Sequence, residues 1–352
     1  MSKIKRARAI VAVFLILAAL AFVFTSVSSA VSYAETLTSA KAAALVEVSS
    51  GRVLFEQNSD ARLPMASTTK IMTALVVLDK ASLDEVVQVD DAAIGVEGSS
   101  LYLKKGEKLT VRELLYGLML RSGNDCAVAL ALHVGGSVER FAEYMNEKAA
   151  ELGLTNSHFC NPHGLHNEKH FTSALDLAKI TCSALKNDDF AKIVATQSIT
   201  ISDGFGNQTR HIANKNKLLK NFDFADGVKT GFTKKAGRCF VGSATENGMK
   251  LVAVVLNCGP MFEDAEKMLT FGFDNFRMQT VLAEKQLVGA LYKTGNTSYF
   301  FTPSNFAYPI STNGDENDSL TKTVDIDPTT NTAQITVKFG AETVYFKQVA
   351  AQ

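Results

Sequence analysis

The stretch Ala66-Ser67-Thr68-Thr69-Lys70, followed at once by residues 71–78, is the part of this sequence that decides the fold. Residues 71–78 are apolar almost without a break and contain neither Gly nor Pro, which predicts a helix buried on most of its faces. Pro64, just before this stretch, suits the entry to a helix. Ser67 and Lys70 then stand three residues apart in the first turn, so their side chains share one face.

The pairing of Ser67 with Lys70 indicates nucleophilic chemistry. A Ser hydroxyl is a weak nucleophile until a base takes its proton. A Lys amine can be that base if burial or a nearby cation lowers its pKa. The start of a helix also supplies backbone N–H groups and a positive dipole end, which favour a developing oxyanion. Taken alone, S-x-x-K fits a helix cap with a solvated Lys equally well, so other elements must decide.

Residues 1–34 have the pattern of a secretory signal peptide. Basic residues within positions 3–8 precede an uncharged run over 9–24, and small residues follow up to Ala34. We expect cleavage after Ala34, with Ala30 as the second choice. An uncleaved membrane anchor is the alternative, because the apolar run approaches spanning length. In either case we expect the rest of the chain to work outside the cytoplasm.

The composition is that of a globular enzyme. The hydrophobic fraction is 46% of 352 residues, which is enough for a sizeable core. The formal net charge is +0 and no basic block follows the leader, so the sequence gives nucleic-acid binding no electrostatic support. The five Cys residues are scattered without C-x-x-C spacing, which argues against a structural zinc site and leaves one disulfide open.

Patterns typical of strands lie before and after a central stretch whose pattern is typical of helices. We expect strands over 42–48, 52–57 and 227–232, and a hairpin of 238–245 with 249–256 around Asn247-Gly248. We expect helices over 127–134, 138–152, 174–185 and 263–276, and a capping box at 110–113. This order predicts an α+β fold in which one antiparallel sheet is closed by the first and last segments, with a helical cluster packed against it.

The pattern of apolar and polar residues changes near Arg277. Short alternating runs such as 324–326, 333–339 and 343–346 are separated by clusters of Asn, Gly, Asp, Ser and Pro. This pattern predicts a small all-β domain. We therefore expect a signal peptide over 1–34, a catalytic domain over 35–276 and a C-terminal β domain over 277–352.

Two further motifs carry residues that suit the same chemistry as Ser67-x-x-Lys70. Ser122-Gly123-Asn124 falls at the break between two predicted helices, where side chains can project into a cleft. Lys229-Thr230-Gly231 falls on a predicted strand, where a cation and a hydroxyl suit a carboxylate and Gly lets a substrate backbone approach closely. S-x-x-K, S-x-N and K-T-G in this order are together typical of serine β-lactamases and penicillin-binding proteins.

From about Ala40 to Phe276 the chain resembles the low-molecular-mass penicillin-binding proteins that act as D-alanyl-D-alanine carboxypeptidases, the serine peptidases of the S11 type. The resemblance rests on the segments that surround the triplets, which are 64–73, 120–125, 152–165 and 226–237. It implies the fold of the serine β-lactamases and transpeptidases, and an acyl-enzyme mechanism without a cofactor.

The resemblance also implies roles for individual residues. Ser67 would be the acylated nucleophile, Lys70 its general base, and Ser122 the relay of a proton to the leaving D-alanine. The substrate-binding residues would be Asn124 for the amide, Lys229, Thr230 and Gly231 around the terminal carboxylate, and the backbone N–H of Phe232, which with that of Ser67 would form the oxyanion hole. Members of the family often carry His or another polar residue at the position of Phe232, so only its backbone role is carried over.

Several patterns could mislead. His163, His166 and His170 look like a metal cluster, but H-E-x-x-H and an obvious acidic ligand are missing from the sequence around them, so we expect no metal. A second K-T-G at 293–295 lies in the predicted β domain, and we interpret it as a turn. Glu143 and Asn146 faintly resemble the deacylating Glu of class A β-lactamases, yet they lie inside an amphipathic helical stretch.

These observations predict a secreted serine D,D-carboxypeptidase that removes the terminal D-alanine from peptidoglycan pentapeptide stems and is covalently inhibited by β-lactams. A D,D-endopeptidase or a β-lactamase on the same scaffold is the alternative enzyme. A non-catalytic module that binds cell-wall peptide is the alternative from another class, although a binder needs no proton relay. Many members of the family end in an amphipathic helix on the membrane. Here residues 333–349 alternate like strands, so peripheral association with the membrane or cell wall stays open.

Overall fold

A computed structural model describes residues 37–206, 208–312 and 320–352. Within it, Ala40–Gln352 form one compact unit. The predicted signal peptide, residues 1–34, lies outside the described residues. In the described part of the chain no helix is both long and apolar enough to cross a membrane. The division of the remaining chain at residue 276 stays a prediction.

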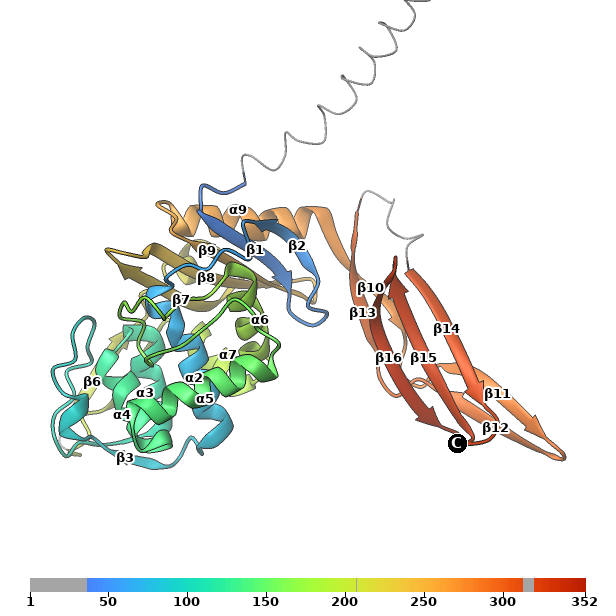
Figure 1. The fold of residues 1–352 in the computed structure, drawn as a ribbon, viewed down its shortest axis with the longest axis horizontal. Helices are drawn as coiled ribbons and strands as arrows, with labels where there is room; N and C mark the ends of the chain where they lie inside the picture. Colours follow the sequence, from blue (N-terminus) through green and yellow to red (C-terminus); the bar gives the residue numbers. More distant parts are fainter. Residues whose placement is uncertain (1–36, 207, 313–319) are drawn as a thin grey trace, which may run out of the picture. The chain divides into compact units, whose positions relative to one another are not determined.

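The central element is a five-stranded antiparallel sheet that joins the two ends of the catalytic region, as the sequence predicted (Figure 1). Its strand order is β2-β1-β9-β8-β7. The strands are β1 (Ala42–Glu47), β2 (Val53–Gln57), β7 (Ala225–Thr233), β8 (Gly237–Glu246) and β9 (Met249–Leu256). Asn247 and Gly248 both have positive φ at the turn between β8 and β9, which is why this dipeptide marked the hairpin.

Helices cover both faces of this sheet (Figure 1). Helix α9 (Met261–Asn275) lies against β8 and β9, and Gly272 brings its backbone close to Leu45 and Leu251. The other face packs on the helical cluster, in which α6 (Ala174–Leu185) contacts β1 and β9. Because successive strand residues point to opposite faces, one sheet contributes to two apolar layers.

Helix α2 (Lys70–Lys80) runs through the centre of the helical cluster. All its residues from Lys70 to Val77 are buried, so this helix is apolar around most of its circumference rather than amphipathic. Around it lie α3 (Val111–Tyr116), α4 (Asn124–Gly135), α5 (Val138–Glu151) and α7 (Asp188–Ala195). The predicted capping box opens α3, where Thr110 and Glu113 each accept from the other's backbone N–H.

The C-terminal part is rich in β-structure, as expected. Its strands are β10 (Phe276–Leu282), β11 (Leu287–Lys293), β12 (Asn296–Phe301), β13 (Phe306–Ser311), β14 (Leu320–Asp327), β15 (Thr332–Phe339) and β16 (Glu342–Ala350). A small core forms around Leu282, Ile335 and Val337. Lys293 pairs with Asn296 across the β11–β12 hairpin, so Thr294 and Gly295 make its two-residue turn. The second K-T-G is therefore a turn, as predicted.

Sequence analysis missed one segment that borders the site. Helix α7 leads into a hairpin of β5 (Ser198–Ser202) and β6 (Thr209–Ala213), and a short helix, α8 (Leu218–Asn221), follows. The two strands bury only Ile201 and Ile212 between them. With so few apolar positions the alternation is too weak to identify strands.

Candidate active site

The predicted nucleophile lies on a tight turn rather than inside an α-helix. Ala66–Thr69 form a 3-10 turn and α2 begins at Lys70, so the helix starts three residues later than the sequence suggested. Ala66 has φ 50°, a left-handed conformation that is uncommon for a residue with a side chain. Such strain is often found at functional sites. Ser67 itself is partly exposed, whereas its neighbours are buried.

Strand β7 packs directly against this turn at Gly231. A Cβ built on Gly231 would lie 3.0 Å from the backbone nitrogen of Ser67 and 3.1 Å from that of Thr68. The sequence suggested that a substrate backbone approaches Gly231. In the structure the backbone close to Gly231 is that of the turn that carries Ser67. This close approach brings the K-T-G segment next to Ser67, and the side chain of Phe232, which follows, is 65% exposed.

The side chain of Lys70 is completely buried, and its nitrogen has three polar neighbours. Its Nζ lies 3.2 Å from Ser67 Oγ, 2.6 Å from Asn124 Oδ1 and 2.6 Å from the backbone oxygen of His163. Burial, and next the charge of Lys229, hold the pKa of Lys70 well below its ordinary value. When this amine is neutral, it donates its two N–H groups to Asn124 Oδ1 and the His163 oxygen. Its lone pair is then available to the hydroxyl of Ser67, as a general base requires.

The side chain of His170 contacts the turn that carries Ser67. The Nδ1 of His170 accepts from the backbone N–H of Cys160 at 2.9 Å, so its Nε2 carries the proton and donates to Thr69 Oγ1 at 2.8 Å. The Thr69 hydroxyl donates in turn to the backbone oxygen of Ala66. Burial lowers the pKa of His170 to about 3 and that of His163 to about 4, so both rings are neutral near pH 7.

The S-x-N triplet lies at the break that the sequence predicted. A π-helical turn over Gly117–Arg121 ends at Ser122, which has φ 65°, and α4 begins at Asn124. π-turns of this kind are frequent at functional sites. Asn124 is 3% exposed, and its amide Nδ2 donates to the backbone oxygen of Glu97 while Oδ1 accepts from Lys70. In this arrangement Asn124 orients the candidate base. The contact of Asn124 with substrate that the sequence suggested stays a prediction.

Lys229 lies on strand β7 and is buried. Its side chain is 1% exposed and its Nζ donates to the backbone oxygen of Thr230 at 3.0 Å. Burial, and next the charge of Lys215, lower the pKa of Lys229 to about 7. A group with this pKa changes charge near neutral pH, and only its protonated form attracts a carboxylate.

A cavity of about 410 Å³ has lining residues from all three triplets. Ser67, Ser122, Thr230, Gly231 and Phe232 line it, together with residues that sequence analysis missed, namely Ser99, Lys215, Lys217, Arg238, Met261 and Phe262. No acidic side chain occurs among these described lining residues, whereas Lys215, Lys217 and Arg238 are cations. The cavity therefore suits an anionic ligand. No short motif marks these cations, because Lys215 and Lys217 lie in the stretch between β6 and α8, whereas Arg238 lies on β8.

The three histidines of the loop do not converge on one point. His163 lies near Lys70, His170 contacts Thr69, and His166 lies 3.0 Å from Glu168 Oε1 at the surface. Among the residues that the structure describes, no group of three or more metal-binding side chains comes together. All five Cys residues are free, and all except Cys160 are buried.

Glu143 and Asn146 have local structural partners. Glu143 pairs with Arg140 on the exposed side of α5. Asn146 accepts from the backbone N–H of Phe159 at 2.9 Å and donates to its backbone oxygen at 2.8 Å. These contacts give both residues a role in holding α5 and the loop after it.

This chain is similar to known proteins in both sequence and structure. The sequence profile of the peptidase S11 family, described as D-alanyl-D-alanine carboxypeptidase, matches residues 29–259. The D-alanyl-D-alanine carboxypeptidase DacF of Bacillus subtilis (strain 168) is 37% identical over 257 residues, which are 71% of this chain and 66% of the relative. DacC of Escherichia coli (strain K12), also a D-alanyl-D-alanine carboxypeptidase, is 37% identical over 256 residues, which are 68% of this chain and 63% of the relative.

The chain spans a little under two thirds of the length of these curated relatives. Among solved structures, penicillin binding protein 5 from Haemophilus influenzae superposes with a TM-score of 0.75 at 25% identity, covering 90% of this chain and 97% of that one. This agreement includes the C-terminal β-rich part and confirms the predicted fold class. Because the family profile matches more than half of the sequence, the chain belongs to the D-alanyl-D-alanine carboxypeptidase family of S11 peptidases.

Proposed function

We propose that this protein is a serine D,D-carboxypeptidase that removes the terminal D-alanine from peptidoglycan pentapeptide stems through an ester on Ser67. The setting of Lys70 is the observation that carries the proposal. Its amine is buried, its pKa is lowered, and its two other polar neighbours leave the lone pair to Ser67. A protein that only binds peptide has no need of a buried neutral amine beside a partly exposed hydroxyl.

The chemistry follows from the positions of these groups. Lys70 takes the proton of Ser67, and Oγ attacks the carbonyl carbon of the penultimate D-alanine. The backbone N–H groups of Ser67 and Phe232 stabilise the oxyanion. The C–N bond breaks while Ser122 passes a proton to the leaving amine. Water then hydrolyses the ester, returning a proton to Ser67.

The cations of the cavity explain why the substrate should end in a carboxylate. Thr230 in the cavity and Lys229, which is buried on the same strand, bind that carboxylate, and Lys215 adds positive charge to the cavity lining. Cross-linking consumes the terminal D-alanine as a leaving group, so its removal limits cross-linking. β-lactams carry a comparable carboxylate beside a reactive amide and would acylate Ser67. We expect that ester to hydrolyse slowly, because Glu143 is paired elsewhere.

The compartment follows from the sequence. Peptidoglycan lies outside the cytoplasmic membrane, and the signal peptide that the sequence predicts over residues 1–34 would deliver the enzyme there. We propose that the mature protein acts at the outer face of that membrane or within the cell wall, with peptidoglycan as its partner.

A release assay tests the proposed activity. The purified protein should liberate free D-alanine from an acylated Lys-D-Ala-D-Ala tripeptide, measured with D-amino-acid oxidase. EDTA should leave the rate unchanged, because the mechanism uses only side chains and backbone groups. A folded protein that liberates no D-alanine would contradict the proposal. So would activity that chelation abolishes and zinc restores.

A further inference from the structure

One wall of the active-site cavity has no part in the proposed reaction. Phe232 and Arg238 line this wall from the sheet, and Met261 and Phe262 line it from the first turn of helix α9. The reaction uses the backbone N–H of Phe232 and none of the four side chains. We call these four residues the α9 wall. Its side chains are three apolar groups and one guanidinium.

The strand register places Phe232 and Arg238 side by side. Phe232 on β7 pairs directly with Arg238 on β8, and Thr230 pairs with Phe240 in the same register. Residues that face each other in an antiparallel pair point to one face of the sheet, as do residues two apart on one strand. All four side chains therefore share the face on which α9 packs, where the ring centroids of Phe240 and Phe262 lie 4.9 Å apart.

The guanidinium of Arg238 is accessible to a ligand. Its side chain is exposed, and Nη1 donates to the backbone oxygen of Gly259 at 3.5 Å, which is long for a hydrogen bond. The described residues that line the cavity include no carboxylate that could compete for it. A guanidinium can hold the carboxylate of a ligand through two parallel bonds.

The three apolar side chains of the α9 wall suit an aliphatic group. Phe232 is 65% exposed although its ring is apolar, and Met261 and Phe262 are half-buried. Apolar side chains that gather at a cavity beside a polar group are typical of a surface that a ligand covers. The α9 wall as a whole therefore fits an aliphatic chain that ends in a carboxylate.

The position of the wall relates it to one residue of the substrate. Strand β7 lies at the end of the strand order, and an extended peptide can add to such an edge as a further strand. The proposed function places the terminal D-alanine at Thr230. Phe232 follows Thr230 by two residues, and the third residue from the end of the stem precedes the terminal one by two. In an antiparallel, extended substrate the third residue is therefore opposite Phe232, and its side chain points to the same face.

The span from the substrate to Arg238 requires a long side chain. Adjacent strands lie about 4.8 Å apart, so the added peptide would lie roughly 10 Å from strand β8. An arginine side chain and a chain of three methylene groups can bridge this span together, across the ring of Phe232.

We propose that the α9 wall is a subsite for the side chain of the third stem residue, and that it selects side chains with a free terminal carboxylate over those that end in an amide. Arg238 binds the carboxylate, and Phe232, Met261 and Phe262 contact the methylene groups. The inference rests on the proposed function, since the substrate forms the same ester on Ser67. It adds a second carboxylate contact, on the acyl side of the scissile bond, to the one at the terminal D-alanine.

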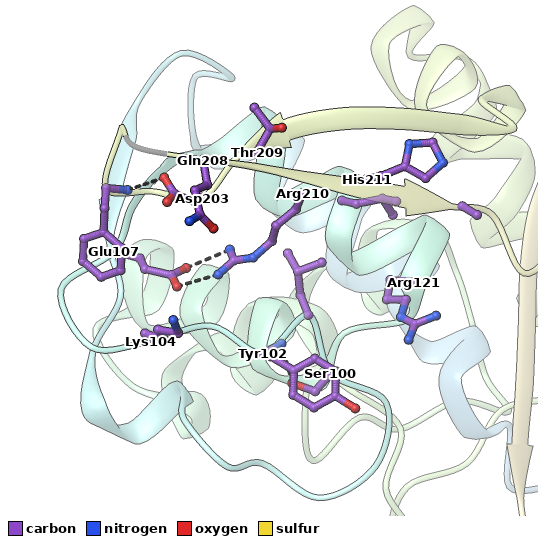
Figure 2. A pocket seen from close by; sticks show the side chains of 14 residues that line it. Ser100, Tyr102, Lys104, Glu107, Arg121, Asp203, Gln208, Thr209, Arg210 and His211 are labelled. Atoms are coloured by element: carbon purple, nitrogen blue, oxygen red, sulfur yellow. Dashed lines mark hydrogen bonds and ion pairs between the residues drawn. The ribbon is translucent and has the colours of Figure 1, made fainter.

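A matched control lies on the other side of the site. Arg121 is bonded directly to Ser122, but it lines a separate cavity of about 530 Å³ together with Tyr102 and Arg210 (Figure 2). Its side chain is exposed, like that of Arg238. Loss of general positive charge around the site would affect variants of both arginines, whereas loss of the subsite would affect only the variant of Arg238.

The test uses two acetylated tripeptides that end in D-Ala-D-Ala and differ in one group. Their first residue is L-α-aminoadipic acid in one and its side-chain amide in the other. Wild type should have a kcat/KM for release of D-alanine about tenfold higher for the acid than for the amide. Arg238→Gln should lower the value for the acid about tenfold and that for the amide much less, so that the two become similar. Arg238→Lys should keep part of the preference, and Arg121→Gln should keep all of it.

The outcomes separate this inference from the proposed function. A wild-type protein that releases D-alanine equally well from both tripeptides would overturn the inference alone. Equal losses for both tripeptides in Arg238→Gln, or a loss of the preference in Arg121→Gln as large as that in Arg238→Gln, would also overturn it. A wild-type protein that releases no D-alanine from either tripeptide and takes up no penicillin would overturn the proposed function, and the inference with it.

Discussion

Replacing Lys70 with Gln is expected to slow acylation of Ser67 by at least about a hundredfold, which is the lower range of what a positioned general base contributes. Gln keeps N–H donors for Asn124 Oδ1 and the His163 backbone oxygen, so neither buried acceptor is left without a partner. The substitution removes the basic lone pair and shortens the side chain by one atom. The measurement is the second-order rate constant for a fluorescent penicillin, followed by stopped flow.

The pH dependence of acylation gives a second view of Lys70. Its pKa is lowered, so the neutral, basic form is already present below the ordinary range of a Lys. The wild-type rate should rise with pH as Lys70 loses its proton and then level off, and the Gln variant should show no such rise. Lys80→Gln, at the exposed end of the same helix, is the control and should behave as wild type. Acylation of Lys70→Gln within about threefold of wild type would contradict the role of Lys70 as base.

Replacing Lys229 with Ala should lower kcat/KM for a substrate with a free terminal carboxylate by at least about tenfold, since a contact to a charged group contributes on the order of 1.5–3 kcal/mol. The loss should be much smaller for the same substrate with an amidated terminus, because that contact is then mostly absent in both enzymes. Lys293→Ala, in the turn-forming second K-T-G, is the control and should change neither rate. Equal losses on both substrates would show that Lys229 acts on structure or proton transfer.

Lys229 also sets the alkaline limit that we expect for the acid substrate. Its pKa lies at about 7, and only the protonated form attracts a carboxylate. In the free enzyme that attraction is complete below this pKa and disappears as the pH rises through it. The kcat/KM profile for the acid substrate should therefore fall on the alkaline side, and the amide substrate should lack this fall.

The strands of the sheet and one of its hairpins could be predicted because their signals are local. Asn247-Gly248 fixed one hairpin, and the apolar run after Lys70 fixed the central helix, since both depend on residues adjacent in sequence. The β5–β6 hairpin could not be predicted in this way. Its strands lie at the surface and are held by Glu107 and Arg210, two residues that are 103 positions apart. Tertiary contacts, and not propensity, stabilise that segment.

The candidate site also contains groups that the sequence marks and groups that it does not. Three triplets identified Ser67, Ser122 and Lys229 because side chains with distinct chemistry mark them. The backbone oxygen of His163, which contacts Lys70, has no signature because every residue carries one. Lys215 reaches the cavity from an irregular segment, and only its bond to Ser99 reveals its position. Sequence analysis therefore named the candidate reactive groups and Asn124, but neither the backbone oxygen of His163 nor Lys215.

The most direct test of the account is covalent labelling of Ser67. A fluorescent penicillin should attach to the wild-type protein, survive denaturation in gel electrophoresis, and add its mass to the peptide that contains Ser67. Ser67→Ala should fold with an unchanged circular dichroism spectrum and take up no label. Label that persists in Ser67→Ala, or an adduct that maps to another residue, would contradict the claim that this serine is the nucleophile.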